Sequence, residues 1–254
     1  HAGLACAKPA KEAAKTASII EDLQRTGTRL NEIAVLVRAS HQTRSFEEKF
    51  IKEAIPHKVL AGMRFYERQE IRDAIAYLRV IAQPNDDMAF ERIINVPKRG
   101  IGAATIDKVR TVAREHIISF NSALELILEG NDLKGKTKET LLNLTEQFKK
   151  WRGLGRDISH IELAQLVLEE SGYIDMWRMD KSPESTGRIE NLKEFVNALH
   201  EFSNLDMFLE HVSLVMDSDA ITDGEQVTIM TYHAAKGLEY EAVIMPGWEE
   251  GLFP

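Results

Sequence analysis

Val227-Thr-Ile-Met-Thr-Tyr-His-Ala-Ala-Lys-Gly-Leu-Glu-Tyr240 is the stretch that decides how the rest of the sequence is interpreted. Its first five residues are mostly apolar or β-branched, a composition typical of a buried strand. Polar and small residues follow at once, and the carboxyl edge of a sheet is where α/β proteins bind ligands. Thr231 and His233 offer hydrogen bonds, and Glu239 offers an acceptor for a sugar hydroxyl. From the chemistry alone, a ligand-binding edge and a plain strand-to-helix connection remain equally open.

The sequence is α/β on both sides of a long helical stretch. Ile33–Val37 is a continuous apolar run that predicts a buried parallel strand, and Lys58–Leu60 and Ala242–Met245 predict further strands. Helices are predicted at 14–23, 45–55, 69–82, 87–94, 103–118, 122–129, 138–151, 160–171, 188–202 and 206–216. This pattern predicts an all-α domain at 83–225 that is inserted into an α/β domain formed by 1–82 and 226–254.

The composition is that of a globular protein and excludes several other classes. Hydrophobic residues make up 44% of the 254 residues, and no apolar run approaches the roughly 18 residues that a membrane span needs. The single cysteine, Cys6, excludes an internal disulfide, and the eight histidines lack metal-ligand spacing. We therefore expect a reducing, cytoplasmic setting. The net charge of −8 is uneven, because 92–114 holds six basic side chains and one acidic, whereas 157–225 holds four basic and sixteen acidic.

The basic part of the helical stretch contains Asn95-Val-Pro-Lys-Arg-Gly-Ile-Gly-Ala-Ala-Thr105. A Gly-Ile-Gly sequence that leads into a helix presents unpaired backbone N–H groups to an anion, and the helix dipole adds to the attraction. Lys98 and Arg99 add two cations, and Thr105 adds a hydroxyl. The combination predicts a contact with DNA phosphate that carries no base specificity. A plain helix–turn–helix corner is the alternative.

A second string, Ala61-Gly-Met-Arg-Phe-Tyr-Glu-Arg-Gln-Glu-Ile-Arg-Asp73, opens a predicted helix. Phe65 and Tyr66 could stack on bases while Arg64 holds a phosphate, which is the usual chemistry of single-strand binding. The alternative is that both aromatic residues belong to the core and that Arg64 pairs with a nearby glutamate.

Gly130-Asn-Asp-Leu-Lys-Gly-Lys-Thr137 matches the phosphate-loop pattern G-x-x-x-x-G-K-[ST] letter for letter. That loop needs a buried strand before it and a helix after it. The preceding residues 122–129 predict a helix instead, and Asp132 would place a negative charge where a phosphate should sit. Thr137 is better interpreted as the N-cap of the next helix.

Several of these strings together resemble the motifs of UvrD/Rep/PcrA-type superfamily 1A DNA helicases. Thr231–Tyr240 is similar to motif V of that family, T-L-H-x-A-K-G-L-E-F/Y, with Tyr232 in place of the usual leucine. The other resemblances are Ala61–Asp73 to G-G-x-x-F-F-E-R-x-E-I-K-D, Val37–Arg44 to Y-R-S-N-x-Q-S-R, Asn95–Thr105 to a Gly-Ile-Gly hairpin, and Gly247–Pro254 to E-E-G-x-F-P. They follow the family's order and cover roughly residues 28–254.

The resemblance implies a fold and a set of site residues. Residues 1–82 and 226–254 would form an incomplete second RecA-like domain, called 2A, and 83–225 the helical domain 2B. Gly237 and Glu239 would contribute to binding of ATP, the glutamate at the ribose. The residues that would contact DNA are Arg38, Arg64, Phe65, Thr231 and His233 on the single strand, with Arg44 as a further candidate, and Lys98, Arg99, Gly100, Ile101, Gly102 and Thr105 on the duplex. A surface-charge role is the alternative for Arg38 and Arg44.

The resemblance also implies an activity for the parent protein, an ATP-dependent helicase that unwinds duplex DNA in the 3'-5' direction during repair or replication. ATP and Mg²⁺ would be its cofactors, and single-stranded DNA, duplex DNA and repair or replication proteins its partners. We expect the phosphate loop and the magnesium-binding carboxylates upstream of this fragment, and an arginine-bearing motif after Pro254. The fragment would then hold no catalytic residue and would not hydrolyse ATP alone.

Two alternative functions remain open from the sequence. One is a nucleotide-binding enzyme that uses Gly130–Thr137. The other is a helical protein-interaction module whose acidic 157–225 surface faces a partner.

Overall fold

The structure, a computed structural model, describes residues 2–60, 62–130, 133–217 and 224–247. Residues 248–254, which carry most of the resemblance to E-E-G-x-F-P, lie outside the described residues. The chain divides into two compact units. Unit 1 comprises residues 1–68 and 211–254, and unit 2 comprises residues 69–210. The first boundary differs from the expected one at 82/83 because the helix at 69–82 belongs to the helical unit. The second differs from the expected one at 225/226 because residues 211–225 belong to unit 1.

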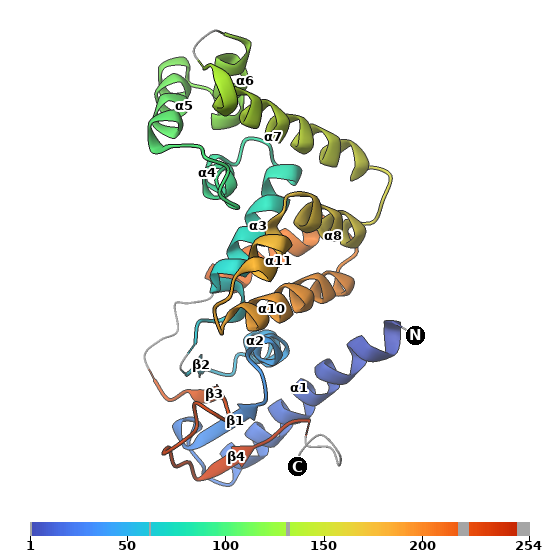
Figure 1. The fold of residues 1–254 in the computed structure, drawn as a ribbon. Coiled ribbons are helices and arrows are strands. Elements are labelled where there is room, and N and C mark those ends of the chain that lie inside the picture. Colours follow the sequence, from blue (N-terminus) through green and yellow to red (C-terminus); the bar gives the residue numbers. More distant parts are fainter. Residues whose placement is uncertain (1, 61, 131–132, 218–223, 248–254) are drawn as a thin grey trace. The chain divides into compact units, whose positions relative to one another are not determined.

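Unit 1 contains a four-stranded parallel sheet in the order β2-β3-β1-β4 (Figure 1). Its strands are β1 (Ile33–Val37), β2 (His57–Val59), β3 (Val227–Thr231) and β4 (Ala242–Ile244). Its helices are α1 (Ala2–Arg25) and α2 (Thr43–Lys52), with short 3-10 turns η1 (Leu30–Glu32), η2 (Ser40–Gln42) and η3 (Phe65–Glu67). The predicted strands at 33–37, 58–60, 227–231 and 242–245 are therefore confirmed to within one residue at each end.

The core of unit 1 lies between one face of the sheet and the helices α1 and α2. The residues that form it come from α1, η1, β1, α2, the turn after α2 and β3, and they are Ala13, Ala17, Ile20, Leu30, Ile33, Val35, Val37, Phe46, Phe50, Ile55, Val227 and Ile229. The intervening residues Ala34, Thr228 and Met230 are buried as well. Burial on both faces explains why the two central strands are nearly continuous apolar runs rather than alternating sequences.

The strand register determines which segments meet at the carboxyl edge of the sheet. Val37 at the end of β1 pairs with Thr231 at the end of β3, and Val59 at the end of β2 pairs with Ile229. Because all strands are parallel, the chain leaves each strand at the same edge. The segments that begin at Arg38, at Leu60 and at Tyr232 therefore start next to one another, although they are far apart in the sequence.

The described residues of unit 2 form helices and turns only. The helices are α3 (Gln69–Ala82), α4 (Asp87–Ile93), α5 (Ala103–His116), α6 (Phe120–Glu129), α7 (Gly135–Leu154), α8 (His160–Glu170), α9 (Tyr173–Met179) and α10 (Ser185–Ala198), with the turn η4 (Leu199–Glu201). A further helix, α11 (Leu205–Asp217), contains the second boundary between the units.

Aromatic side chains around α3 form the core of unit 2. Tyr77 is fully buried, and its ring contacts those of Phe148, Trp151 and Tyr173 at centroid distances of 6.0–6.4 Å. Such ring pairs stabilise a core beyond the area that they bury. The interpretation of Trp151 and Trp177 as packing residues is confirmed, since they are 0% and 8% exposed. Trp248 lies outside the described residues.

Two helical predictions need correction. The sequence analysis missed α9, and it placed the N-cap of α7 at Thr137, whereas the helix begins at Gly135 with Lys134 as its N-cap. Among the described residues, no helix combines the length and apolar character that crossing a bilayer requires.

Candidate functional site

The segment after β3 forms a compact series of turns at the carboxyl edge of the sheet. The Thr231 hydroxyl accepts a hydrogen bond from the Ala234 N–H at 3.4 Å, and the Ala235 N–H donates to the Thr231 carbonyl at 3.1 Å. The Tyr232 N–H donates to the Val37 carbonyl at 3.2 Å, which fastens this segment to the end of β1. His233 is left exposed, so its ring is available to a ligand.

Gly237 and Glu239 lie at the end of the same series of turns. Gly237 has a φ of +84°, a conformation that side-chain-bearing residues rarely adopt, and this explains the glycine. A Cβ at this position would meet no atom within 4 Å. The backbone conformation, and not a lack of space, therefore favours glycine here. Glu239 is exposed, and a solvent-facing carboxylate can accept hydrogen bonds from sugar hydroxyls.

The segment after β1 is held by a glutamine. The Gln42 Oε1 atom accepts hydrogen bonds from the N–H groups of Arg38 and Ala39 at 3.0 and 3.1 Å. The Arg38 side chain is exposed beside the segment that follows β3, as the register requires. Arg44 is different, because it is 3% exposed and pairs with Glu48 at 2.8 Å. Both the candidate contact of Arg44 with DNA and its alternative, a surface-charge role, are therefore wrong for this structure.

Buried polar side chains on α2 connect this edge with η3 and with α11. We call Arg44, Glu47 and Glu48 the α2 cluster. Glu47 accepts a hydrogen bond from the Phe65 N–H at 3.0 Å, and burial raises the pKa of its carboxyl. Burial acts in the same sense on Glu48, but hydrogen bonds and charges from neighbours, with His211 and Arg44 foremost, outweigh it, so that its pKa is lowered. Tyr66 donates its hydroxyl proton to Glu48 at 2.6 Å.

The structure changes the interpretation of η3. Phe65 is 0% exposed and packs edge-on against Tyr66, which is also buried. The prediction that Phe65 stacks on bases is therefore wrong for this conformation, because its ring has no free face. Arg64 lines a hollow of about 120 Å³ together with Pro56 and His57 at the start of β2.

The sequence analysis missed what the carboxylates after η3 do. Asp73 is buried, accepts a hydrogen bond from the Tyr173 hydroxyl at 3.0 Å and pairs with Arg92 at 2.7 Å. Glu70 is buried as well and accepts from the Asn191 side chain at 2.6 Å. Both acids hold helices of unit 2 together. A signal was available, since an acid on the apolar face of an amphipathic helix needs a buried partner, and both Glu70 and Asp73 fall on that face of α3.

The Gly-Ile-Gly hairpin is fixed by Asn95 at both ends. The Asn95 side-chain carbonyl accepts from the Arg99 N–H at 2.8 Å, and its amide donates to the Ile101 carbonyl at 3.0 Å. Ile101 is buried and anchors the hairpin, while Lys98, Gly100 and Gly102 are exposed. Gly100 has a φ of +74°, which its lack of a side chain permits.

Arg99 does not face the solvent as the sequence analysis expected. Its guanidinium donates to the carbonyls of Ile93, Ile94 and Pro97, to the Tyr77 hydroxyl and to the Ser171 carbonyl, at 2.5–3.4 Å. A side chain that is committed to five acceptors inside the protein is not available for a phosphate. The prediction that Arg99 contacts DNA is therefore wrong for this structure, and its function is to support the hairpin.

The positive charge of 92–114 is smaller than its sequence suggests. Arg92 pairs with Asp73, and Arg110 pairs with Glu91 at 2.6 Å and with Asp107 at 2.8 Å. Asp73 and Glu91 lie outside residues 92–114, so a charge count over that stretch alone leaves them out. Lys98, at the hairpin itself, has no ion pair among the described residues and is the cation best placed for a phosphate. Thr105 is half-buried, and its N–H already donates to the Gly102 carbonyl at 3.0 Å.

The apparent phosphate loop at Gly130–Thr137 lacks the required context. Residues 120–129 form the helix α6 and not a strand, and the Lys138 ammonium donates to the Gly130 carbonyl at 2.9 Å. Asn131 and Asp132 lie outside the described residues. The strand that aims a phosphate loop at its ligand is thus replaced by a helix, which removes the alternative of a nucleotide-binding enzyme built on this segment.

Comparison with known proteins agrees with the motif arrangement. The family model described as "UvrD-like helicase C-terminal domain" matches residues 4–254. A DNA helicase II of Rickettsia typhi is 46% identical over 254 aligned residues, which cover 99% of this chain and 39% of the relative. An ATP-dependent DNA helicase PcrA of Staphylococcus epidermidis is 39% identical over 242 residues, covering 91% and 33%. An ATP-dependent DNA helicase UvrD1 of Mycobacterium tuberculosis is 39% identical over 249 residues, covering 88% and 32%.

Replacing Arg99 by alanine should destabilise unit 2, because several carbonyls would lose a charged donor. We expect a loss of about 2 kcal/mol or more in the free energy of unfolding, measured by urea denaturation. Arg99→Lys should restore only part of it, since one ammonium cannot span these acceptors. The control is Lys98→Ala, an exposed neighbour whose removal should change stability by less than about 0.5 kcal/mol. Equal stabilities of the two alanine variants would contradict the supporting role of Arg99.

Replacing each of the two adjacent acids of the α2 cluster, Glu47 and Glu48, should change the melting temperature Tm with opposite pH dependence. Glu48 has a lowered pKa, so its stabilising effect is present above the ordinary value of 4.5 and is lost as the pH falls through its folded value. Glu48→Gln should therefore lower Tm at pH 7, with a difference that shrinks in acid. Glu47 has a raised pKa, so its ionisation destabilises the fold as the pH rises above 4.5. Glu47→Gln should raise Tm more at pH 8 than at pH 5. Parallel profiles for the two variants would show that the assignment is wrong.

Proposed function

The chain belongs to the family of UvrD-like helicase C-terminal domains, and we propose that it is the DNA-handling part of an ATP-dependent DNA helicase. The chain spans about two fifths of the length of the Rickettsia relative that it matches. The activity of the whole protein is therefore part of the proposal. Its 3'-5' direction and its service in repair or replication follow from the family resemblance.

One observation carries the proposal, the register between β1 and β3. It places Arg38 beside the turns that begin at Thr231, although these residues come from opposite ends of the chain. The carboxyl edge of an open parallel sheet is where α/β proteins bind nucleotides and related ligands. We assign unit 1 to the incomplete RecA-like domain 2A and unit 2 to the inserted helical domain 2B.

At this edge, Thr231, His233 and Arg38 are the residues that we assign to single-stranded DNA. The exposed histidine can donate a hydrogen bond to a phosphate oxygen or stack on a base, and Arg38 supplies a cation for the backbone. The Thr231 hydroxyl and the main chain of the turns fix the position of His233. Phe65 is left out of this contact because its ring is buried, whereas Arg64 stays assigned to it on the family resemblance alone.

Gly237 and Glu239 fit one side of an ATP site. The glycine allows the chain to turn at the edge of the sheet, and the exposed Glu239 carboxylate can accept a hydrogen bond from a ribose hydroxyl. ATP, with Mg²⁺ to neutralise its phosphates, supplies the free energy for movement along DNA. The contribution of this chain is to orient the nucleoside, and none of the residues that we assign here is a catalytic base.

The hairpin of unit 2 is the part that we assign to duplex DNA. Exposed Lys98 and the backbone at Gly100 and Gly102 face solvent, while Asn95 and Arg99 hold the loop from within. A backbone that is preset by internal hydrogen bonds loses little conformational freedom on binding a phosphate. Such a contact positions the duplex without reading its sequence.

Lys98→Ala should weaken binding to a fluorescent duplex oligonucleotide. The slope of log K against log salt concentration should become shallower by about one unit, because one phosphate contact is lost. Arg99→Lys, which keeps the charge but disturbs the support of the loop, should leave that slope nearly unchanged. An unaltered affinity and slope for Lys98→Ala would remove the hairpin from the duplex contact.

His233→Ala should weaken binding of a labelled oligothymidine to the chain at low salt, by about threefold to tenfold for the loss of one hydrogen bond or stacking contact. Its control is His200→Ala, which removes an exposed histidine of unit 2 and should have no effect. Equal losses for both variants would argue against single-strand binding at the carboxyl edge.

A further inference from the structure

The base of the Gly-Ile-Gly hairpin is held by the hydroxyl of a buried tyrosine. Tyr77 of α3 donates this hydroxyl proton to the Val96 carbonyl at 2.5 Å, and the same oxygen accepts a hydrogen bond from the Arg99 guanidinium at 2.5 Å. Val96 and Arg99 lie on either side of Pro97 and Lys98 in the sequence. One hydroxyl therefore fastens both ends of the segment that carries Lys98, the cation that we assign to duplex DNA.

The position of this hydroxyl is set by the aromatic core of unit 2. Tyr77 is 0% exposed, and its ring stacks on that of Phe148 with an interplanar angle of 19° and meets the ring of Trp151 edge-on. A ring that is enclosed at the packing density of a protein interior has no room to turn toward another partner. Burial raises the pKa of the Tyr77 hydroxyl, so the group keeps its proton and can donate as well as accept.

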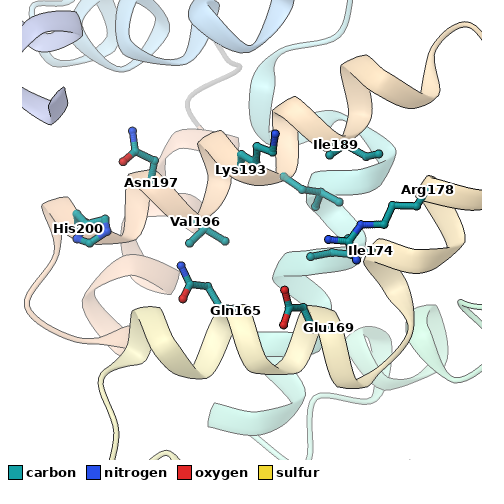
Figure 2. Close-up of a pocket in the computed structure, with 10 residues that line it drawn as sticks. Gln165, Glu169, Ile174, Arg178, Ile189, Lys193, Val196, Asn197 and His200 are labelled. Atoms are coloured by element: carbon teal, nitrogen blue, oxygen red, sulfur yellow. The ribbon is translucent and has the colours of Figure 1, made fainter. Parts of the chain in front are cut away.

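The turn between α8 and α9 holds the hairpin from a second element. The Arg99 guanidinium donates to the Ser171 carbonyl in this turn at 3.4 Å. Glu169 and Ile174, which lie on either side of the turn, line the same groove between the helices (Figure 2). Because α8 and α9 pack as a pair, the turn that joins them is a fixed support. The base of the hairpin is thus held by this turn and by α3 together.

Asn95 and Tyr77 hold the hairpin in different ways. The Asn95 side chain joins two points of the hairpin itself, the Arg99 N–H and the Ile101 carbonyl, so it sets the shape of the loop. The Tyr77 hydroxyl joins the loop to α3, so it sets the position of the loop within unit 2. Without this hydroxyl, the Val96 carbonyl and one Arg99 N–H group lose a partner, and leaving partly buried polar groups unpaired is costly. The base of the hairpin would shift to recover those bonds.

We propose that Tyr77 is a positioning residue for duplex binding, because its hydroxyl holds Lys98 and the backbone at Gly100 and Gly102 where they meet phosphates. The inference rests on the duplex contact that is proposed above for the hairpin. A loop that is fixed before binding loses less conformational freedom when a phosphate docks. Removing the hydroxyl therefore lowers the affinity for duplex DNA without removing a contact to it.

Tyr77→Phe in the full chain tests the proposal, since it removes the hydroxyl and keeps the ring in the core. The affinity for a fluorescent duplex oligonucleotide should fall by about threefold to tenfold. The slope of log K against log salt concentration should stay nearly unchanged, because every phosphate contact remains. Lys98→Ala should differ from it in that slope, since that variant loses a phosphate contact.

Tyr173→Phe is the matched control. Tyr173 is another buried tyrosine of the same aromatic cluster, but its hydroxyl donates to the Asp73 carboxylate and to the Glu70 carbonyl and not to the hairpin. Both phenylalanine variants lose a buried hydroxyl and should have a lower Tm. Only Tyr77→Phe should lose duplex affinity, whereas a role limited to stability would weaken binding by both variants or by neither.

Glycine amide signals test the position of the hairpin without DNA. In a chain labelled with ¹⁵N-glycine, the amide signals of Gly100 and Gly102 should shift in Tyr77→Phe and stay in place in Tyr173→Phe. These two glycines are exposed and lie outside the core, so a change confined to core packing would not move their signals.

Three outcomes would overturn the proposal. They are unchanged Gly100 and Gly102 signals in Tyr77→Phe, equal losses of duplex affinity in the two phenylalanine variants, and shifted signals with full duplex affinity while Lys98→Ala binds more weakly. An unaltered affinity of Lys98→Ala, with the glycine signals shifted in Tyr77→Phe, would instead overturn the duplex contact itself. Tyr77 would then set the position of the hairpin for another purpose.

Discussion

The parallel pairing of β1 with β3 is the constraint on which the candidate site depends. It joins Val37 to Thr231, which are about 190 residues apart, and so closes a long loop that contains all of unit 2. The entropic cost of closing a loop rises only with the logarithm of its length, so a large helical unit between two strands adds little to that cost. The burial of Val35 and Ile229 in one core compensates for it. The positions of the edge residues Arg38 and His233 therefore depend on the same apolar contacts that close the loop.

Arginine side chains in this protein show why a local count of charges is a poor guide to a nucleic-acid surface. Arg99, Arg92 and Arg44 would each be counted as potential phosphate contacts, yet each is held by acceptors within its own unit. A guanidinium offers five donors in a planar fork, which suits it to joining several carbonyls or carboxylates inside a fold. A lysine presents one compact charge at the end of a flexible chain. The exposed Lys98 next to the half-buried Arg99 separates these two functions within one hairpin.

The sequence predicted the parts of the fold that rest on periodicity or on continuous apolar runs. The strands at 33–37 and 227–231 and the helix at 69–82 were located correctly, because each has a strong pattern of its own. The short helix α9 was missed, although α4, which has the same length of seven residues, was predicted. The direction in which a side chain points was harder to predict from the sequence than the position of a helix or strand. Whether Phe65 faces a base or the core depends on Glu47, which lies 18 positions away and accepts the Phe65 N–H.

The α2 cluster shows how the edge of the sheet and the two boundaries of unit 1 share one support. At its start, α2 follows Gln42, which fixes the backbone at Arg38. On its buried side, Thr43 accepts a hydrogen bond from Arg68, the last residue before the first boundary, at 3.0 Å. Glu48 lies 3.8 Å from His211, the first residue after the second boundary. Because α2 and its N-cap residue Gln42 carry all three contacts, the unit 1 ends of both connections are fixed relative to the carboxyl edge. Displacing α2 would alter the site and both connections together.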